Sequence, residues 1–219
     1  MVDAARPTLA ILTRAPSSGG KRRLFQTLDI PPDVDLRRAL LLDTVDGSAL
    51  AGVRRVVAVT PASACEEIRE LTGIVDVMSQ PDGDLGERMQ TVMAALFEQG
   101  ASAVALIGSD VPQITAAPIA ETFDVLDSDR DALVLGPSTD GGYYLIGARR
   151  VPDVFTNMQW GTSLVLSSTV RAAATLGFRV HQLPLMCDVD TVEDLRAAVS
   201  SGRARRSAAW MRTRLDNSQ

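Results

Sequence analysis

Short, uninterrupted apolar runs alternate with amphipathic segments along nearly the whole chain. The clearest apolar runs cover residues 8–13, 55–60 and 103–107. Segments with helical spacing follow them at 36–50, 62–71 and 114–126. A strand covered on both faces is a continuous apolar run, and successive parallel strands need a helical crossover. The alternation therefore predicts a three-layer α/β/α domain around a mostly parallel, Rossmann-like sheet.

Weaker patterns complete the expected order of elements. Further strands are expected at 74–78, 132–135, 143–147 and 179–183, and further helices at 85–97, 163–176 and 192–199. Asp140-Gly141 between two of these strands is typical of a hairpin, so one small antiparallel pair is expected. The chain has no internal repeat and no long linker. We expect a single nucleotide-binding and catalytic domain at 1–200, followed by a basic helical tail at 201–219 packed through Trp210.

Charge and cysteine content exclude several classes of protein. Lys and Arg number 22 against 27 Asp and Glu, giving a net charge of −5, whereas a duplex-binding domain is usually basic. Cys65 and Cys187 are too far apart to suggest a zinc site or a disulfide framework. The N-terminal residues lack an export-signal pattern, and no apolar run reaches the roughly 18 residues of a membrane span. The expectation is a cytoplasmic protein without a membrane span or nucleic-acid partner.

The loop after the first predicted strand carries features of an anion site. It contains small residues and then Lys21, Arg22 and Arg23, which open the next helix. Loop amides and a helix N-terminus favour an anion, and Arg can bind phosphate oxygens bidentately. Ala15 and Arg22 occupy positions that a Walker loop reserves for Gly and for Ser or Thr, so that motif is excluded. Phosphate binding is the favoured interpretation, with a flexible surface loop as the alternative.

Acidic residues follow two other predicted strands. Asp110 comes directly after the most apolar strand, and Asp188 and Asp190 would point to one side of an extended backbone. Neighbouring carboxylates repel unless a cation lies between them, and Mg²⁺ or Mn²⁺ prefers oxygen ligands. Two alternatives stay open. In the first, Asp110 caps the helix that follows it. In the second, Thr191 and Asp194 form a capping box at the start of the last predicted helix, or Asp190 is itself the N-cap residue of that helix.

Two more loops offer polar groups at the predicted edge. The amide of Gln80 suits a nucleobase edge, and Gly86 lets a flat ring approach the backbone, although a plain turn explains both residues. Asp140 is an acceptor or a general base if its turn lies over the site.

Taken together, six ordered segments resemble the GT-A fold of nucleotide-diphospho-sugar transferases. The resemblance is nearest to a bacterial family of glycosyltransferases associated with radical-SAM and arsenosugar gene clusters. A more distant resemblance is to guanylyltransferases that act on molybdopterin or phospholactate. The segments that carry it are residues 21–24, 83–86, 108–112, 140–147, 160–163 and 188–191. They span about nine-tenths of the chain, and the family's usual Thr is replaced by Arg22.

The resemblance implies a role for each matching position. Nucleotide phosphates would face Arg14, Lys21, Arg22 and Arg23. The base would lie near Gln80 and Gly86, and the sugar or acceptor near Asp140, Gly141 and Tyr143. The metal, Mg²⁺ or Mn²⁺, would be held by Asp110, Asp188 and Asp190.

These roles define a preferred function and two alternatives. The preferred one is a metal-dependent glycosyltransferase that moves a sugar from a nucleotide diphosphate to an unknown small acceptor, with Asp110, Asp140 and Lys21 as catalytic residues. The first alternative is a guanylyltransferase-like nucleotidyltransferase that joins a nucleoside triphosphate to a phosphorylated small molecule and releases pyrophosphate. The second is a non-catalytic, nucleotide-binding regulatory domain. A homodimer is compatible with each.

Overall fold

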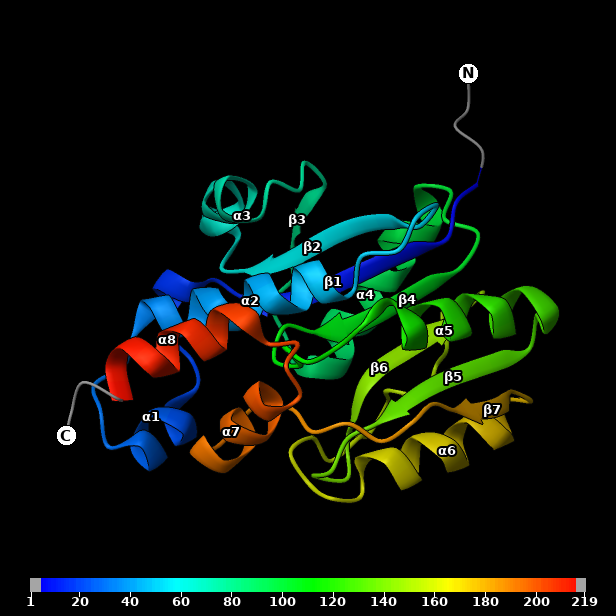
Figure 1. Ribbon diagram of the computed structural model, residues 1–219. Helices are drawn as coiled ribbons and strands as arrows, with labels where there is room; N and C mark the ends of the chain where they lie inside the picture. The colour runs from blue at the N-terminus through cyan, green and yellow to red at the C-terminus, as the bar shows by residue number, and fades with distance from the viewer. Residues whose placement is uncertain (1–4, 216–219) are drawn as a thin grey trace.

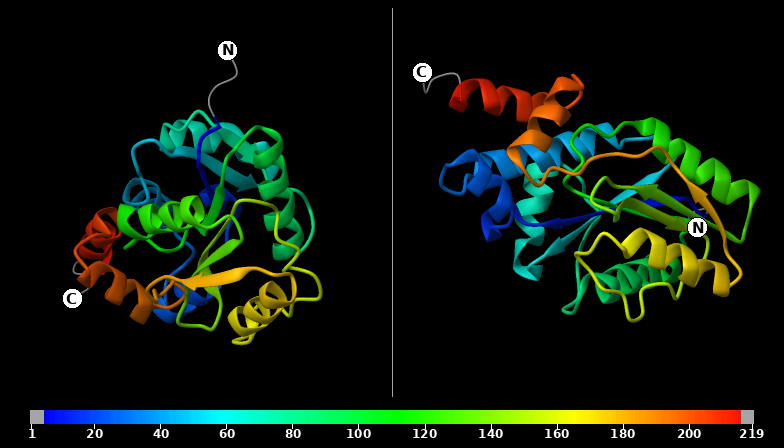
Figure 2. Two further views of the ribbon diagram at one scale, coloured as in Figure 1. Left: turned by 90° about the vertical axis from the view of Figure 1, so that its right-hand side faces the viewer. Right: turned by 90° about the horizontal axis from the view of Figure 1, so that it is seen from below.

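The computed structural model describes residues 5–215, which form a seven-stranded sheet between two layers of helices (Figures 1 and 2). The strand order is β3-β2-β1-β4-β6-β5-β7, and only β6 runs antiparallel to its neighbours. The strands are β1 (Thr8–Arg14), β2 (Arg54–Thr60), β3 (Val77–Ser79), β4 (Val104–Gly108), β5 (Ala132–Pro137), β6 (Tyr143–Ala148) and β7 (Arg179–Gln182). The predicted three-layer, mostly parallel fold with a small antiparallel pair is confirmed.

The helices cover both faces of the sheet. One apolar core joins the sheet to α2, α3 and α5, and a second joins its other face to α4 and α6. The α-helices are α1 (Arg22–Leu28), α2 (Val34–Gly47), α3 (Cys65–Thr72), α4 (Leu85–Glu98), α5 (Ala116–Ser128), α6 (Val165–Thr175), α7 (Val192–Ser200) and α8 (Arg205–Leu215). Two 3-10 turns precede α1 and α3, namely η1 (Pro16–Ser18) and η2 (Ala62–Ala64).

One strand was placed wrongly by the sequence pattern. The apolar residues of the stretch 74–78 predicted a strand, but only Val77–Ser79 pairs with β2. Ile74 is buried against the first core, and Val75 is 82 % exposed. The apolar character of this stretch thus comes partly from a packed loop, which a run of apolar letters does not distinguish from a strand.

A third apolar cluster lies outside the sheet and joins α1, α2, α7 and α8. Trp210 of α8 is buried in it, and Figure 1 shows α8 beside α2. The buried carboxylate of Asp43, on α2, accepts hydrogen bonds from the backbone N–H groups of Arg206 and Ser207. Asp43 thereby satisfies donors in the first turn of α8. Residues 216–219 of the expected tail lie outside the described residues.

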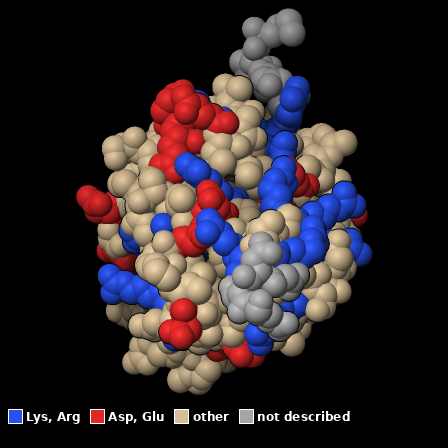
Figure 3. Space-filling model, turned by 60° about the vertical axis from the view of Figure 1, so that its left-hand side comes forward, with Lys and Arg blue, Asp and Glu red and all other residues tan. Residues whose placement is uncertain are grey.

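The face drawn in Figure 3 carries both acidic and basic side chains, which adjoin one another near its centre. Acidic side chains cluster near its top, and Lys and Arg side chains run down its right side.

Over residues 5–215, no helix is both long enough and apolar enough to cross a membrane.

The order in which successive strands are added to the sheet reverses between β1 and β4. The chain leaves β1 toward β2 on one side, whereas β4 pairs with β1 on the other side, in parallel. In open α/β sheets, ligands bind at the carboxyl ends of strands where the order reverses in this way. The fold therefore directs attention to the loops that follow Arg14 and Gly108.

Candidate functional site

A cleft of about 620 Å³ opens at the carboxyl ends of β1 and β4. It is bounded by the loop before α1, the start of α2, the loop after β4 and the β5–β6 turn. Ten of the predicted site residues line it, namely Arg14, Lys21, Arg22, Arg23, Gln80, Asp110, Asp140, Tyr143, Asp188 and Asp190. Gly86 and Gly141 do not line the cleft.

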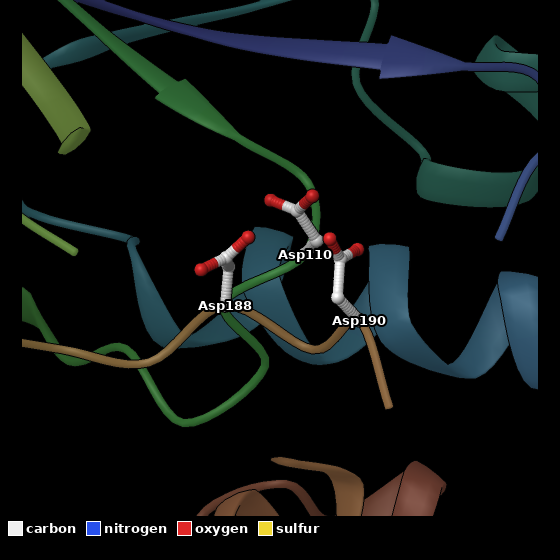
Figure 4. Close-up of side chains that lie close together, drawn as sticks. All are labelled: Asp110, Asp188 and Asp190. Atoms are coloured by element: carbon white, nitrogen blue, oxygen red, sulfur yellow. The ribbon is translucent and has the colours of Figure 1, made fainter. Parts of the chain in front are cut away.

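Three carboxylates converge at one end of this cleft. Asp110, Asp188 and Asp190 each offer an oxygen atom, and these atoms lie within 4.8 Å of one another. Figure 4 shows the side chains arising from two different segments and pointing toward a common space. The segments are joined directly, because the backbone N–H of Val189 donates to the carbonyl of Asp110 over 2.8 Å. Residues 78 positions apart in the sequence thus form one acidic cluster.

The position of Asp110 depends on two small features around β4. A Cβ atom built on Gly108 would lie 2.5 Å from Oδ1 of Asp110, so only glycine leaves room for the carboxylate. The buried hydroxyl of Thr44, on α2, lies 3.0 Å from the carbonyl oxygen of Leu40 and 3.2 Å from that of Ser109, so its single proton is shared between these two acceptors. Asp110 does not cap the next helix, because Thr115 is the N-cap residue of α5.

The segment that carries Asp188 and Asp190 ends in a capping box. Thr191 is the N-cap of α7, its hydroxyl accepts from the backbone N–H of Asp194, and the Asp194 carboxylate accepts from Thr191 in return. The predicted box is therefore confirmed, with Thr191 rather than Asp190 as the cap. Because Asp194 serves the helix, the carboxylate of Asp190 is left to face the cleft.

Lys21 bridges two of the three carboxylates. Its Nζ donates to Oδ2 of Asp110 over 2.9 Å and to Oδ1 of Asp190 over 3.0 Å. Lys21 has a left-handed backbone with φ of 56°, which turns the chain directly before α1. Burial lowers the pKa of its ammonium, but Asp110 and Asp190 more than offset this and raise the pKa above its usual range. Arg23 lies 3.8 Å from Asp190 and is 72 % exposed, so Lys21 is the firmly held cation.

The acidic cluster fits a hard divalent cation. Burial raises the pKa of Asp188 to about 6, and repulsion from Asp110, Asp140 and Asp190 adds to the shift. No cationic side chain of residues 5–215 pairs with Asp188. Carboxylate oxygens are the ligands that Mg²⁺ and Mn²⁺ prefer, and a cation would relieve this repulsion. The Lys21 ammonium already serves that purpose between the other two carboxylates.

The two residues expected near a base are used differently. Gln80 is buried, and its Nε2 donates to the carbonyls of Thr13 and Ala58 over 2.9 and 2.7 Å. Both amide hydrogens are thereby engaged in joining β1 to β2, which leaves Gln80 no donor for a base. A Cβ on Gly86 would lie 2.7 Å from the ring of Trp160, so this glycine permits helix-to-loop packing. Gln80 lines the cleft and retains Oε1 as an acceptor, so its contact with a base stays a prediction, whereas Gly86 does not line the cleft.

Contacts within and around the β5–β6 turn explain two residues of its sequence, Asp140 and Gly141. Oδ1 of Asp140 accepts from the backbone N–H of Gly142 over 2.9 Å and from the hydroxyl of Ser138. A Cβ on Gly141, whose φ is +89°, would lie 2.4 Å from the carbonyl oxygen of Ser163. Asp140 therefore stabilises its own turn while lining the cleft. Gly141 is needed for close backbone packing and does not line the cleft, and its contact with a sugar or acceptor stays a prediction.

Tyr143 lines the wall of the cleft through its ring. Its hydroxyl is buried near the side chain of Thr169, and burial raises the pKa of Tyr143 above the usual range. The phenol is therefore neutral at physiological pH.

Sequence analysis missed Arg37 and Thr44 as parts of this site, and it assigned no role to Gly108 although this residue opens the segment 108–112. Arg37 lines the cleft, Thr44 contacts the carbonyl of Ser109, and Gly108 leaves room for the Asp110 carboxylate. Arg37 and Thr44 are polar residues within an ordinary helical pattern, so no local sequence signal marks them as parts of the site. Gly108 does carry one, because a glycine two residues before an acidic residue at a strand end leaves space for the carboxylate.

Comparisons with known protein sequences give a family and two relatives. The family described as "Uncharacterized protein conserved in bacteria (DUF2064)" matches residues 44–162. A phosphoenolpyruvate guanylyltransferase of Rubrobacter xylanophilus is 27 % identical over 190 residues, which are 84 % of this chain and 89 % of the relative. A 3-phospho-D-glycerate guanylyltransferase of Phenylobacterium zucineum is 30 % identical over 144 residues, covering 64 % and 66 % of the two chains.

Solved structures agree with these relationships. A Desulfovibrio desulfuricans G20 protein assigned as a nucleotide-diphospho-sugar transferase superposes with a TM-score of 0.81 and 28 % identity, covering 95 % of this chain and 98 % of that one. Rv0371c from Mycobacterium tuberculosis H37Rv, solved with manganese, has a TM-score of 0.52 and 18 % identity, covering 90 % and 100 %, and shares the fold. The resemblance to nucleotide-diphospho-sugar transferases and guanylyltransferases is thereby confirmed.

Proposed function

From the premise that this chain belongs to the bacterial family DUF2064 and is a transferase, we propose that it is a metal-dependent nucleotidyltransferase. Its substrates would be a nucleoside triphosphate, with GTP as first choice, and a small phosphorylated carboxylic acid. Phosphoenolpyruvate and 3-phosphoglycerate, which appear in the names of its relatives, both belong to that class.

The observation that carries this proposal is the convergence of Asp110, Asp188, Asp190 and Lys21 at the edge where the strand order reverses. Three carboxylate oxygens beside one ammonium suit a divalent cation bound to a polyphosphate. The Arg22 and Arg23 side chains line the same cleft and add positive charge for phosphate oxygens.

In the proposed reaction, a phosphate oxygen of the acceptor attacks the α-phosphorus of the triphosphate. A new P–O bond forms, the bond from the α-phosphorus to the bridging oxygen of the β-phosphate breaks, and pyrophosphate leaves with the electron pair. A cation held by Asp110, Asp188 and Asp190 would supply electrostatic stabilisation of the leaving group. Lys21 is held beside these carboxylates, so its ammonium is positioned to stabilise developing negative charge.

Nucleotidyl transfer needs less from this site than glycosyl transfer does. An acceptor phosphate is already an anion, whereas inverting transfer to a hydroxyl needs a general base. Asp140 was expected to be that base, but one of its oxygens is engaged by Gly142 and Ser138 in the turn. Glycosyl transfer, our preference from the sequence, stays as the second candidate because a 28 % identical structure is assigned to nucleotide-diphospho-sugar transferases.

The product distinguishes the candidates. Purified protein with Mg²⁺ or Mn²⁺ would be incubated with GTP and either 3-phosphoglycerate or phosphoenolpyruvate, and separately with a panel of nucleotide sugars. Nucleotidyl transfer predicts pyrophosphate and a guanylylated acid in equal amounts, detected by ³¹P NMR and mass spectrometry. Free nucleoside diphosphate from a nucleotide sugar would support glycosyl transfer. Nucleotide binding that leaves every donor intact would support the regulatory-domain alternative.

The metal requirement has its own test. Chelation with EDTA should abolish turnover, and added Mg²⁺ or Mn²⁺ should restore it. The substitution Asp110→Asn should weaken Mn²⁺ binding in the absence of nucleotide, measured by the free-Mn²⁺ paramagnetic resonance signal. Unchanged Mn²⁺ affinity in that variant would remove Asp110 from the proposed ligand set.

A further inference from the structure

Arg37, in the second turn of α2, is held in a fixed position at the wall of the cleft. Its Nε donates to the carbonyl oxygen of Pro16 over 2.8 Å, and its guanidinium carbon lies 5.5 Å from the centre of the Phe25 ring. Pro16 begins η1, and Phe25 is on α1. The side chain therefore spans three segments around the basic loop and lines the cleft together with Lys21 and Arg22.

Within residues 5–215, Nε is the donor of this guanidinium that forms a hydrogen bond. Nη1 is buried and has no hydrogen-bond partner among the described residues, and no carboxylate of residues 5–215 pairs with Arg37. The next residue provides a contrast, because Arg38 is exposed and forms an ion pair with Asp35 at 3.4 Å. Partly burying a guanidinium without an anion is costly. The cost points to an anion that the protein itself does not supply.

We infer that Arg37 binds the distal phosphates of the nucleoside triphosphate, the part that leaves as pyrophosphate. A planar guanidinium can bind two phosphate oxygens at once, and contacts with Pro16 and Phe25 orient the group before the ligand arrives. Arg37 also lies on the side of α2 that faces the acidic cluster. Thr44 follows it at a spacing of seven residues, about two helical turns, and contacts the loop that carries Asp110. The inference rests on the proposed use of a triphosphate.

A purely structural role makes a different prediction. If Arg37 only braced the loop through Pro16, its loss would disturb binding of every nucleotide equally. Direct contact with distal phosphates affects only ligands that contain them. A series of GTP, GDP, GMP and inorganic pyrophosphate therefore separates the two roles.

The experiment compares wild-type protein with Arg37→Gln and Arg37→Lys by titration calorimetry in Mg²⁺ buffer, with Arg38→Gln as the matched control. Arg37→Gln should weaken GTP and pyrophosphate binding about 10- to 100-fold, as expected for lost charge-assisted hydrogen bonds, and leave GMP affinity unchanged. Arg37→Lys keeps the charge but lacks the planar fork, so it should show an intermediate loss. Arg38→Gln should bind all four ligands like the wild type, and thermal melts verify that each variant is folded.

Several outcomes would overturn the inference. Equal losses for GMP and GTP would assign Arg37 a bracing role. Unchanged GTP and pyrophosphate affinities with weakened 3-phosphoglycerate binding would place the acceptor phosphate there instead. If the wild type releases pyrophosphate from GTP but Arg37→Gln binds pyrophosphate normally, only this inference fails. If pyrophosphate binding depends on Arg37 but the wild type never releases it from GTP, only the proposed function fails. A wild type that binds neither GTP nor pyrophosphate would overturn both.

Discussion

The substitution Gly108→Ala tests whether the acidic cluster is built as the structure indicates. Gly108 is the last residue of β4, and a Cβ at this position would lie 2.5 Å from Oδ1 of Asp110. Ordinary contact between nonbonded heavy atoms begins near about 3.5 Å, so the carboxylate must withdraw by about 1 Å. Ligand distances in a metal site are maintained within about 0.2 Å, so Asp110 can no longer share a cation with Asp188 and Asp190.

The stability of the fold should change much less than metal binding. The group that the new methyl meets is the end of a flexible side chain, and no backbone or core atom lies within 3.5 Å of it. The main loss is the contact between Asp110 and Lys21, a partly exposed ion pair whose contribution is below about 1 kcal/mol. The melting temperature should therefore fall by less than about 4 °C. Mn²⁺ affinity should fall about 10- to 100-fold, as is usual when a ligand loses its support.

The assay is a Mn²⁺ titration followed by paramagnetic resonance, with thermal unfolding recorded for the same samples. Gly136→Ala is the matched control, because its Cβ would lie 2.5 Å from the buried ring of Tyr144. This variant should lose about 1–3 kcal/mol of stability through overpacking but bind Mn²⁺ normally below its melting temperature. The reasoning is refuted if Gly108→Ala binds Mn²⁺ as tightly as the wild type.

Three further substitutions have expected outcomes. Thr44→Val removes a hydroxyl whose proton is shared between the carbonyls of Leu40 and Ser109, so it should lower stability by about 1–2 kcal/mol in thermal melts and also weaken Mn²⁺ binding. Asp188→Asn removes a carboxylate whose pKa is raised to about 6 by burial and by repulsion from its acidic neighbours. In EDTA at pH 8 it should stabilise the protein by about 1–2 kcal/mol after solvent screening, while Mn²⁺ affinity falls. Gly86→Ala forces a methyl against Trp160 and should cost about 1–3 kcal/mol in denaturant unfolding without changing pyrophosphate affinity.

The fold could be predicted because burial and secondary structure leave periodic signals. Strands such as Thr8–Arg14 and Val104–Gly108 are covered on both faces, so they are uninterrupted apolar runs. Parallel strands bring their carboxyl ends to one edge of a sheet, so the sequence predicted that Asp110 and the segment after β7 share that edge. The contact itself depends on residues 183–191, which follow β7 and bond to the carbonyl of Asp110 through the N–H of Val189. Chain direction therefore predicted the edge, and the path of this segment determines the cluster.

Predictions about individual side chains were weaker, because hydrogen bonding with neighbours decides them. Gln80 has the chemistry to recognise a base, but the open carbonyls of Thr13 and Ala58 take both of its donors. Asp140 has the chemistry of a base, but the N–H of Gly142 takes one of its oxygens. The sequence shows which partners a side chain is able to bind, but the fold determines which of these partners lies within hydrogen-bonding distance.

Helix α2 illustrates how far this limit extends. Arg37 and Thr44 on one side of it contact the cleft and the Asp110 loop, whereas Asp43 and Asp46 on another side hold Arg206 of α8. All four are polar residues, and polar residues are ordinary on the solvent-exposed face of an amphipathic helix. Their roles arise only because two loops and a C-terminal helix cover most of this helix. The site therefore depends on α2 as much as on the motifs that first revealed it, and substitution of Thr44, which contacts the Asp110 loop, should affect ligand binding and fold stability together.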